Sequence, residues 1–219
     1  MTMNALNKWK SFLSEGGHST FPYQIYCDMD GVLVNFQDGV IDYVNNSLQN
    51  VENGNKYKEK LRTALDRLGR EHKITIKDIS FDKSIRLKSA RNYMYKLVGN
   101  NREFWANLKW MPEGKAVWSY IKKFNPIILS APMSGEGSSQ GKFDWLKRNL
   151  GIDESKVILT HDKFKHATEN SLLIDDMLKF LDPWIEAGGE GIHHHSAQTT
   201  IEKLKEIAGN GGRIDEEDI

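Results

Sequence analysis

Short apolar runs alternate with longer segments of helical periodicity along the second half of the chain. Runs of three or four mostly apolar residues at 24–27, 126–129, 157–159 and 172–174 predict buried strands, because polar or glycine residues end each run. A further strand is possible at 191–192. Strands that alternate with helices are typical of a parallel sheet covered on both faces. The expected fold class is therefore α/β, with three layers.

Helical spacing of apolar residues predicts helices at 4–14, 36–48, 57–69, 84–98, 114–124, 143–150 and 199–207, with a shorter one at 101–108. The glycine-rich segment 133–141 is predicted to be a loop, and 73–80 to be irregular or a short strand. The all-helical segment 36–110 separates the first strand from the second. We expect it to be a small helical cap inserted into a core formed by 1–35 and 111–219.

Composition excludes several classes of protein. Of 219 residues, 39% are hydrophobic and 27% are charged, and the formal net charge is zero, which argues against a dedicated membrane or nucleic-acid binder. The single cysteine, Cys27, leaves no internal disulfide and fits a reducing compartment. No signal-like or membrane-spanning apolar run is visible, so a cytoplasmic location is expected. Segment 51–110 holds 15 Lys and Arg against 7 Asp and Glu, which either attracts a phosphorylated substrate or forms solvated helix faces.

Polar residues follow three of the predicted strands, and a lysine follows on the next helix: Asp28 and Asp30, Ser130, Lys142, and Asp175 with Asp176. In an open parallel sheet, ligands bind at the carboxyl ends of the strands, so these residues are expected to converge on one crevice. Such residues also occur in purely structural roles, since a lone Asp pair can cap a helix or lie in a solvated turn.

Together these residue types suit phosphate-ester hydrolysis. Asp28 would attack phosphorus and form an aspartyl-phosphate, and Asp30 would act as the acid/base. Ser130, Lys142 and backbone N–H groups would bind phosphoryl oxygens and neutralise their charge. A Mg²⁺ ion held by carboxylates would shield the nucleophile from its anionic substrate. The predicted metal ligands are Asp28, Asp30, Asp175 and Asp176.

The motifs carry a family resemblance. Asp28-Met29-Asp30-Gly31-Val32-Leu33-Val34 resembles the first motif of the haloacid-dehalogenase-like (HAD) hydrolases. Ser130, Lys142 and Leu172–Asp176 resemble the second, third and fourth motifs, in the same order. This resemblance implies a Rossmann-like core, a Mg²⁺ cofactor and phosphatase activity.

A narrower resemblance is to the 5′(3′)-deoxyribonucleotidases, through Val157–Lys163, the Phe104-Trp105 to Gly114 stretch and Lys142–Trp145. It implies a helical cap after the first strand and a nucleoside monophosphate substrate, with deoxy forms preferred. Phe36 then corresponds to a base-pocket position, and the predicted substrate contacts are Phe36, Ala131, Phe104 and Trp105. The sequence departs from this branch at Asn35, where Asp is usual, and at His161, where Arg is frequent.

The motifs are also compatible with two other functions. One is a phosphatase acting on another small ester or on a polynucleotide end, and the other is a non-catalytic protein that binds phosphate ligands. The expected partner is a small phosphate ester, without membrane or stable nucleic-acid complexes, and a homodimer is possible. The run His193-His194-His195 is interpreted as structural, because consecutive strand residues alternate faces and cannot all reach one ion.

Overall fold

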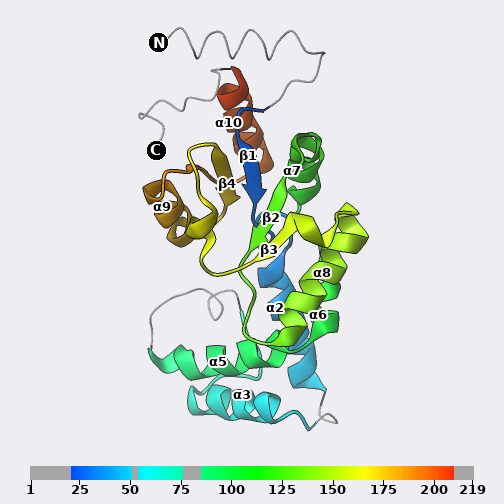
Figure 1. Cartoon of the computed structure of the whole chain (residues 1–219). Coiled ribbons are helices and arrows are strands. Elements are labelled where there is room, and N and C mark those ends of the chain that lie inside the picture. Colours follow the sequence, from blue (N-terminus) through cyan, green and yellow to red (C-terminus); the bar gives the residue numbers. More distant parts are fainter. Residues whose placement is uncertain (1–20, 51–53, 76–84, 210–219) are drawn as a thin grey trace, which may run out of the picture.

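A five-stranded parallel sheet forms the centre of the protein (Figure 1). The computed structural model describes residues 21–50, 54–75 and 85–209, with side chains from residue 91 onward in the third range. The strands are β1 (Gln24–Cys27), β2 (Ile127–Ser130), β3 (Val157–Leu159), β4 (Ser171–Asp175) and β5 (Glu190–His193). Their order is β3-β2-β1-β4-β5, and every neighbouring pair is parallel. The predicted α/β class is confirmed.

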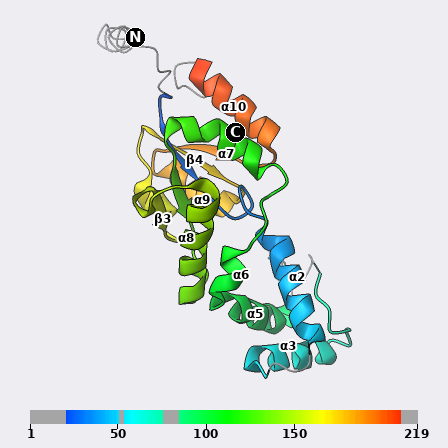
Figure 2. The ribbon, with the colours of Figure 1, turned by 90° about the vertical axis from the view of Figure 1, so that its right-hand side faces the viewer.

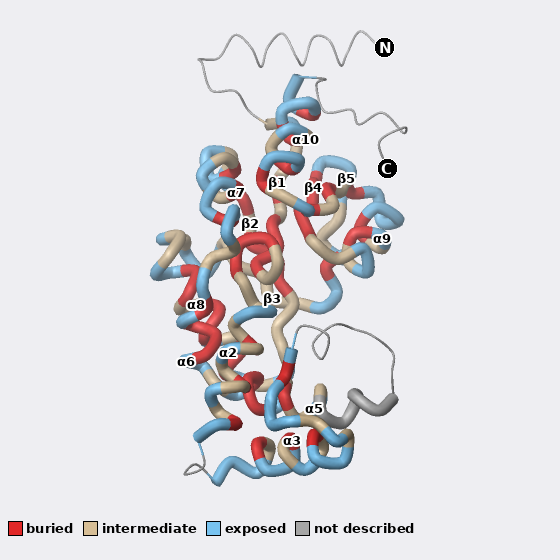
Figure 3. Tube along the Cα trace, turned by 180° about the vertical axis from the view of Figure 1, so that it is seen from behind, coloured by how far each residue is buried: buried red, intermediate tan, exposed pale blue. Residues whose placement is uncertain are grey.

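Helices cover both faces of this sheet, as the three-layer prediction requires. Ile25 and Cys27 of β1 belong to one buried cluster with residues of α7 (Gly114–Ile121) and α10 (Ala197–Gly209), which lie next to each other (Figure 2). Leu173 of β4 belongs instead to a cluster with Trp184 of α9 (Leu178–Glu186). Successive strand residues point to opposite faces, so this division follows from the pleat. Burial is greatest along β2 and β4 (Figure 3).

The chain reverses direction across the sheet at β1. It runs from β1 outward through β2 to β3, then crosses back to β4 on the other side of β1 and ends at β5. Such a switch point opens a crevice at the carboxyl ends of the strands. The fold therefore directs the residues that follow β1, β2 and β4 toward one place.

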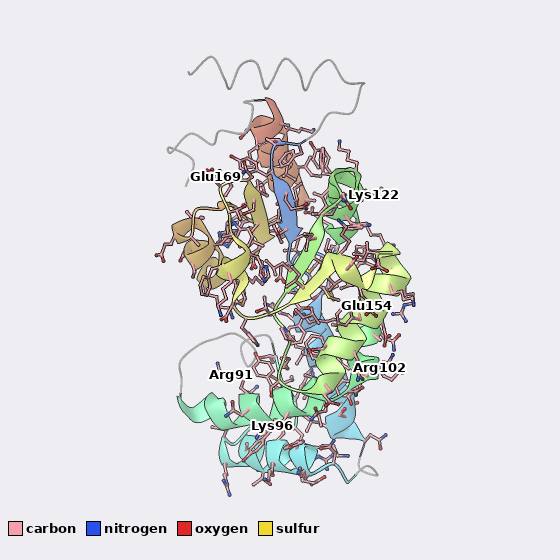
Figure 4. The ribbon with its side chains drawn as sticks, in the orientation of Figure 1. Arg91, Lys96, Arg102, Lys122, Glu154 and Glu169 are labelled. Carbon is pink, nitrogen blue, oxygen red and sulfur yellow. The ribbon has the colours of Figure 1, made fainter. Side chains whose placement is uncertain are left out.

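The helices between β1 and α7 lie beyond this carboxyl edge (Figure 1). They are α2 (Phe36–Gln49), α3 (Lys56–Arg67), α5 (Ile85–Gly99) and α6 (Arg102–Ala106). Helices α3 and α5 pack on each other, and the ammonium of Lys96 lies 5.8 Å from the ring centroid of Tyr57 (Figure 4). Observed α2, α3, α5 and α10 end within two residues of their predicted bounds. None of the described helices is long and apolar enough to cross a bilayer.

Helix α6 connects this helical region to the core. It packs along α8 (Glu136–Leu150), and the guanidinium of Arg102 donates to both carboxylate oxygens of Asp144, at 2.5 and 2.8 Å (Figure 4). The chain passes between the two parts where Val34 pairs with Trp110. Division into a core of 1–35 and 111–219 and a cap of 36–110 stays a prediction, and α6 is the part of that segment in closest contact with α8.

The loop prediction for 133–141 is wrong from residue 136 onward, because α8 begins at Glu136. The two glycines inside the helix, Gly137 and Gly141, serve close packing rather than turning. A Cβ on Gly137 would lie 2.4 Å from the Asn100 backbone, and one on Gly141 would lie 2.4 Å from Cβ of Trp105. The predicted helix 4–14 and most of segment 73–80 fall outside the described residues.

Candidate active site

The first motif forms a buried turn at the carboxyl end of β1. The amide of Asp28 donates to the carbonyl of Ile174, which fixes the nucleophile candidate beside β4. Gly31 has φ = +81°, a conformation that side chains with a Cβ rarely adopt. A Cβ at Gly31 would also lie 2.3 Å from Oδ2 of Asp176. Glycine is thus needed both for the turn and for close approach of Asp176.

Three carboxylates meet at this turn. One oxygen each of Asp28, Asp175 and Asp176 lies within 4.8 Å of the others, although the residues come from opposite ends of the sequence. Burial, followed by the negative charge of Asp28, raises the pKa of both Asp175 and Asp176 to about 7. Oδ1 of Asp176 is buried without a hydrogen-bond partner among the described residues. We call these three residues the carboxylate cluster.

Asp30 lies next to this cluster but is paired differently. Its Oδ2 accepts a hydrogen bond of 2.6 Å from Lys142 Nζ, which also donates to Ser130 Oγ at 2.9 Å. Burial raises the pKa of Asp30, against the opposing effect of Lys142. Asp30, Ser130 and Lys142 were each predicted at this site, and the structure brings them together. It does not bring the Asp30 carboxylate into the carboxylate cluster, where it was predicted as a metal ligand.

Sequence reasoning missed a second buried lysine. Nζ of Lys163 lies 2.6 Å from Oδ2 of Asp175 and 2.9 Å from Oδ1 of Asp28, and its side chain is fully buried. The Phe180 ring covers the ammonium, with its centroid 4.5 Å away. Burial alone would lower the pKa of Lys163, but attraction by Asp28 and Asp175 outweighs it and the pKa is raised. The available signal was its position just after a predicted strand, where site residues gather.

A cavity of about 350 Å³ opens above these side chains. Its walls include three of the four predicted substrate contacts, Phe36, Ala131 and Trp105. The Phe36 and Trp105 rings stack with centroids 5.0 Å apart and planes 12° from parallel. Additional walls that the sequence did not single out as substrate contacts are Met133 from the loop after β2, and Lys179 and Phe180 from α9.

Phe104 does not line this cavity. It packs edge-on against Phe36, with ring centroids 6.3 Å apart, and borders a separate cavity formed by α2, α6 and the residues after α6. Helix α6 turns the two neighbouring aromatics in different directions, because successive helical residues lie about 100° apart. Trp105 therefore borders the cavity above the carboxylate cluster, and Phe104 packs behind the Phe36 wall.

Comparison with known proteins finds similar structures only. No family model and no curated protein sequence matches this chain. The HAD-hydrolase YfnB from Bacillus subtilis, solved with magnesium, is 16% identical over 83% of this chain and 98% of its own, with a TM-score of 0.47.

Two further structures are similar at the same level. The defluorinating L-2-haloacid dehalogenase Rha0230 is 13% identical over 80% of this chain and 86% of its own, with a TM-score of 0.43. A β-phosphoglucomutase from Clostridium difficile is 14% identical over 86% of this chain and 97% of its own, with a TM-score of 0.37. At these values, function must be argued from the side chains of the site.

Proposed function

We propose that this protein is a Mg²⁺-dependent phosphomonoester hydrolase that uses Asp28 as a nucleophile. The observation that carries the proposal is the meeting of the carboxylate cluster with the Asp30–Lys142–Ser130 group beneath one cavity. A nucleophile, an acid/base and phosphoryl-binding groups are the parts that such a reaction needs.

The charge of the site fits a divalent cation. Three carboxylates face one ammonium, that of Lys163, while the charge of Asp30 is matched by Lys142. Carboxylate oxygens are the ligands that Mg²⁺ prefers, and Oδ1 of Asp176, which has no hydrogen-bond partner among the described residues, is an available ligand atom. Asp28, Asp175 and Asp176 would hold the ion, which when bound would supply charge neutralisation for the nucleophile and the transferring phosphoryl group.

Hydrolysis then proceeds in two displacements. A carboxylate oxygen of Asp28 forms a bond to phosphorus as the ester P–O bond breaks, and Asp30 gives its proton to the departing oxygen. Next, Asp30 accepts a proton from water as the water oxygen attacks the phosphorus of the aspartyl-phosphate. Inorganic phosphate leaves and the Asp28 carboxylate is restored. The raised pKa of Asp30 favours the protonated form that the first displacement requires.

Two buried lysines, Lys142 and Lys163, orient and partly neutralise the acidic side chains of the site. Lys142 holds Asp30 and Ser130 in one hydrogen-bonded group, which orients the acid and the hydroxyl that would bind a phosphoryl oxygen. Lys163 contacts Asp28 and Asp175, so it restrains the nucleophile and lowers the repulsion between the two carboxylates.

Release of phosphate from an aryl phosphate tests this proposal. We expect turnover with Mg²⁺, loss of turnover with a chelator, and loss of turnover in Asp28→Asn, whose side chain matches Asp in shape but is a poor nucleophile. Asp182→Asn, a change at an exposed position of α9, is the matched control and should keep full activity. Equal activity of Asp28→Asn and the control would refute the nucleophile assignment.

For the substrate, we propose a nucleoside monophosphate, with deoxy forms preferred. The stacked Phe36 and Trp105 rings form an apolar wall of the cavity, and a planar base can pack against such a wall. A panel of deoxynucleotides, ribonucleotides, sugar phosphates and 3′-phosphorylated oligonucleotides separates the alternatives. Faster turnover of sugar phosphates or oligonucleotide ends would refute the nucleotide as substrate, while the proposed phosphatase activity would stand.

A further inference from the structure

The histidine run begins at the last residue of β5, an outer strand of the sheet that lies next to β4 (Figure 3). His193 pairs in register with Asp175 of β4, and the backbone N–H of His194 donates to the Asp175 carbonyl at 2.8 Å. The extended pairing thus continues past the last residue of β5. His193 and His195 consequently share one side of the strand, and His194 points to the other.

The three rings have different surroundings. His194 is buried, and its Nδ1 lies 2.8 Å from the Thr200 hydroxyl of α10, which gives it a structural role. His193 is half-buried and His195 is exposed, with ring centroids only 4.1 Å apart. The expectation that the whole run is structural therefore applies to its middle residue, while the outer two form a pair that faces solvent.

A hydrogen bond fixes which nitrogen of His193 is free to bind. Its Nε2 lies 3.1 Å from the backbone carbonyl of Asp176, and a carbonyl can only accept, so Nε2 carries the proton. In the neutral ring, Nδ1 is then the nitrogen with a lone pair. Metal-binding histidines characteristically donate their other N–H to a carbonyl or carboxylate in this way, which raises the basicity of the ligating nitrogen.

We propose that His193 and His195 form a site for a borderline transition-metal ion such as Zn²⁺, Ni²⁺ or Cu²⁺, separate from the Mg²⁺ site. Imidazole nitrogen suits these ions, whereas Mg²⁺ requires hard oxygen ligands, so the two sites select different metals. Two imidazoles supply part of the coordination shell and water supplies the rest. The exposed ring of His195 can rotate to bring its nitrogen to the ion.

The position of the pair couples it to the carboxylate cluster. His193 donates to the carbonyl of Asp176, and His194 donates to that of Asp175. An ion on His193 draws electron density from its ring and strengthens the hydrogen bond that Nε2–H donates to the Asp176 carbonyl. Occupancy of the histidine pair should therefore change Mg²⁺ affinity at the carboxylates, and by linkage Mg²⁺ should change Ni²⁺ affinity by the same factor.

Titration calorimetry of the full chain with Ni²⁺, in excess Mg²⁺, tests the proposal without an activity measurement. We expect one Ni²⁺ site, whose affinity falls by at least about tenfold in His195→Gln. Loss of an outer-shell partner already costs a metal site about that much, and His195 is proposed as a direct ligand. His161→Gln, also an exposed histidine, is the matched control and should bind Ni²⁺ as the unmodified chain does. Electron paramagnetic resonance of the Cu²⁺ complex should show two coordinated imidazole nitrogens, and one in His195→Gln.

Equal Ni²⁺ affinity in His195→Gln and the unmodified chain would overturn the proposal, as would absence of binding in the unmodified chain. Circular dichroism verifies that the variant is folded, which is expected because the ring of His195 is exposed. The result is independent of phosphatase activity: Ni²⁺ can bind whether or not Asp28 is a nucleophile.

Discussion

Replacement of Gly31 by alanine separates two contributions of this residue, backbone conformation and close approach to Asp176. The added Cβ would lie 2.3 Å from Oδ2 of Asp176, and ordinary van der Waals contact begins at 3.4 Å, so Asp176 has to move by the difference. Gly188 provides a matched control, because its φ is +93° and nothing lies within 4 Å of a Cβ there. Both variants share the backbone strain, and only Gly31→Ala displaces the carboxylate.

The expected magnitudes follow from these two terms. Left-handed backbone at a residue with a Cβ costs about 1–2 kcal/mol, which lowers Tm by roughly 2–8 °C in a chain of this size. Both variants should show this loss of stability. Gly31→Ala should also lose roughly 100-fold in kcat/KM, the scale expected when a catalytic group moves by about 1 Å.

Calorimetric melting, Mg²⁺ titration and aryl-phosphate kinetics measure these effects on the same samples. Gly188→Ala should keep its Mg²⁺ affinity and kcat/KM, and Gly31→Ala should lose both. If Gly31→Ala melts lower but binds Mg²⁺ and turns over like Gly188→Ala, then Asp176 is not a ligand whose position matters. The assignment of the carboxylate cluster to metal binding would then be refuted.

Further predictions concern the acid/base, the metal-free site and the missed lysine. Asp30→Asn should lower kcat by about 10²–10⁴-fold. The loss should be smaller for an aryl phosphate than for an alkyl phosphate, because an aryl leaving group needs little protonation. Equal losses on the two esters would argue against an acid role. Burial and Asp28 raise the pKa of Asp175 and Asp176 to about 7 from 3.8, so the folded metal-free protein retains protons that the unfolded chain releases. Its Tm in chelator should therefore fall as pH rises from about 4 to 7, and Mg²⁺ should abolish that slope; a Tm that rises over this range would contradict the burial of these acids. Lys163→Met should melt lower, because removal of one partner from a buried ion pair costs about 3–5 kcal/mol, and Mg²⁺ should restore part of the loss. An unchanged melting temperature in chelator would show that the lysine is not needed to compensate the acids.

Prediction from sequence worked where one periodicity dominates a segment. Strands such as 172–174 are short apolar runs with polar ends, and α2, α3 and α5 keep a helical repeat. It failed at 136–141, since glycine signals a turn when the chain is considered alone. Gly137 and Gly141 are instead small because α6 packs against them, a tertiary contact that local pattern does not contain.

The site shows the same division. Asp28, Asp175 and Asp176 could be placed together because parallel strands end at a common edge of the sheet. Lys163 could not be assigned from spacing alone: its contact with Asp28 depends on how η3 (Lys163–His166) folds back against α9. The different directions of Phe104 and Trp105 likewise depend on how α6 packs on α8.

The covalent intermediate is the most direct test of the central claim. Asp30→Asn, in which attack can proceed but water activation is impaired, should be incubated with Mg²⁺ and an aryl phosphate, quenched in acid and mapped by mass spectrometry. We predict a single phosphoryl group on the peptide that contains Asp28, and none when Asp28→Asn is added to the same variant. A phosphoryl group on another residue, or aryl-phosphate hydrolysis that continues in Asp28→Asn, would contradict nucleophilic attack by Asp28.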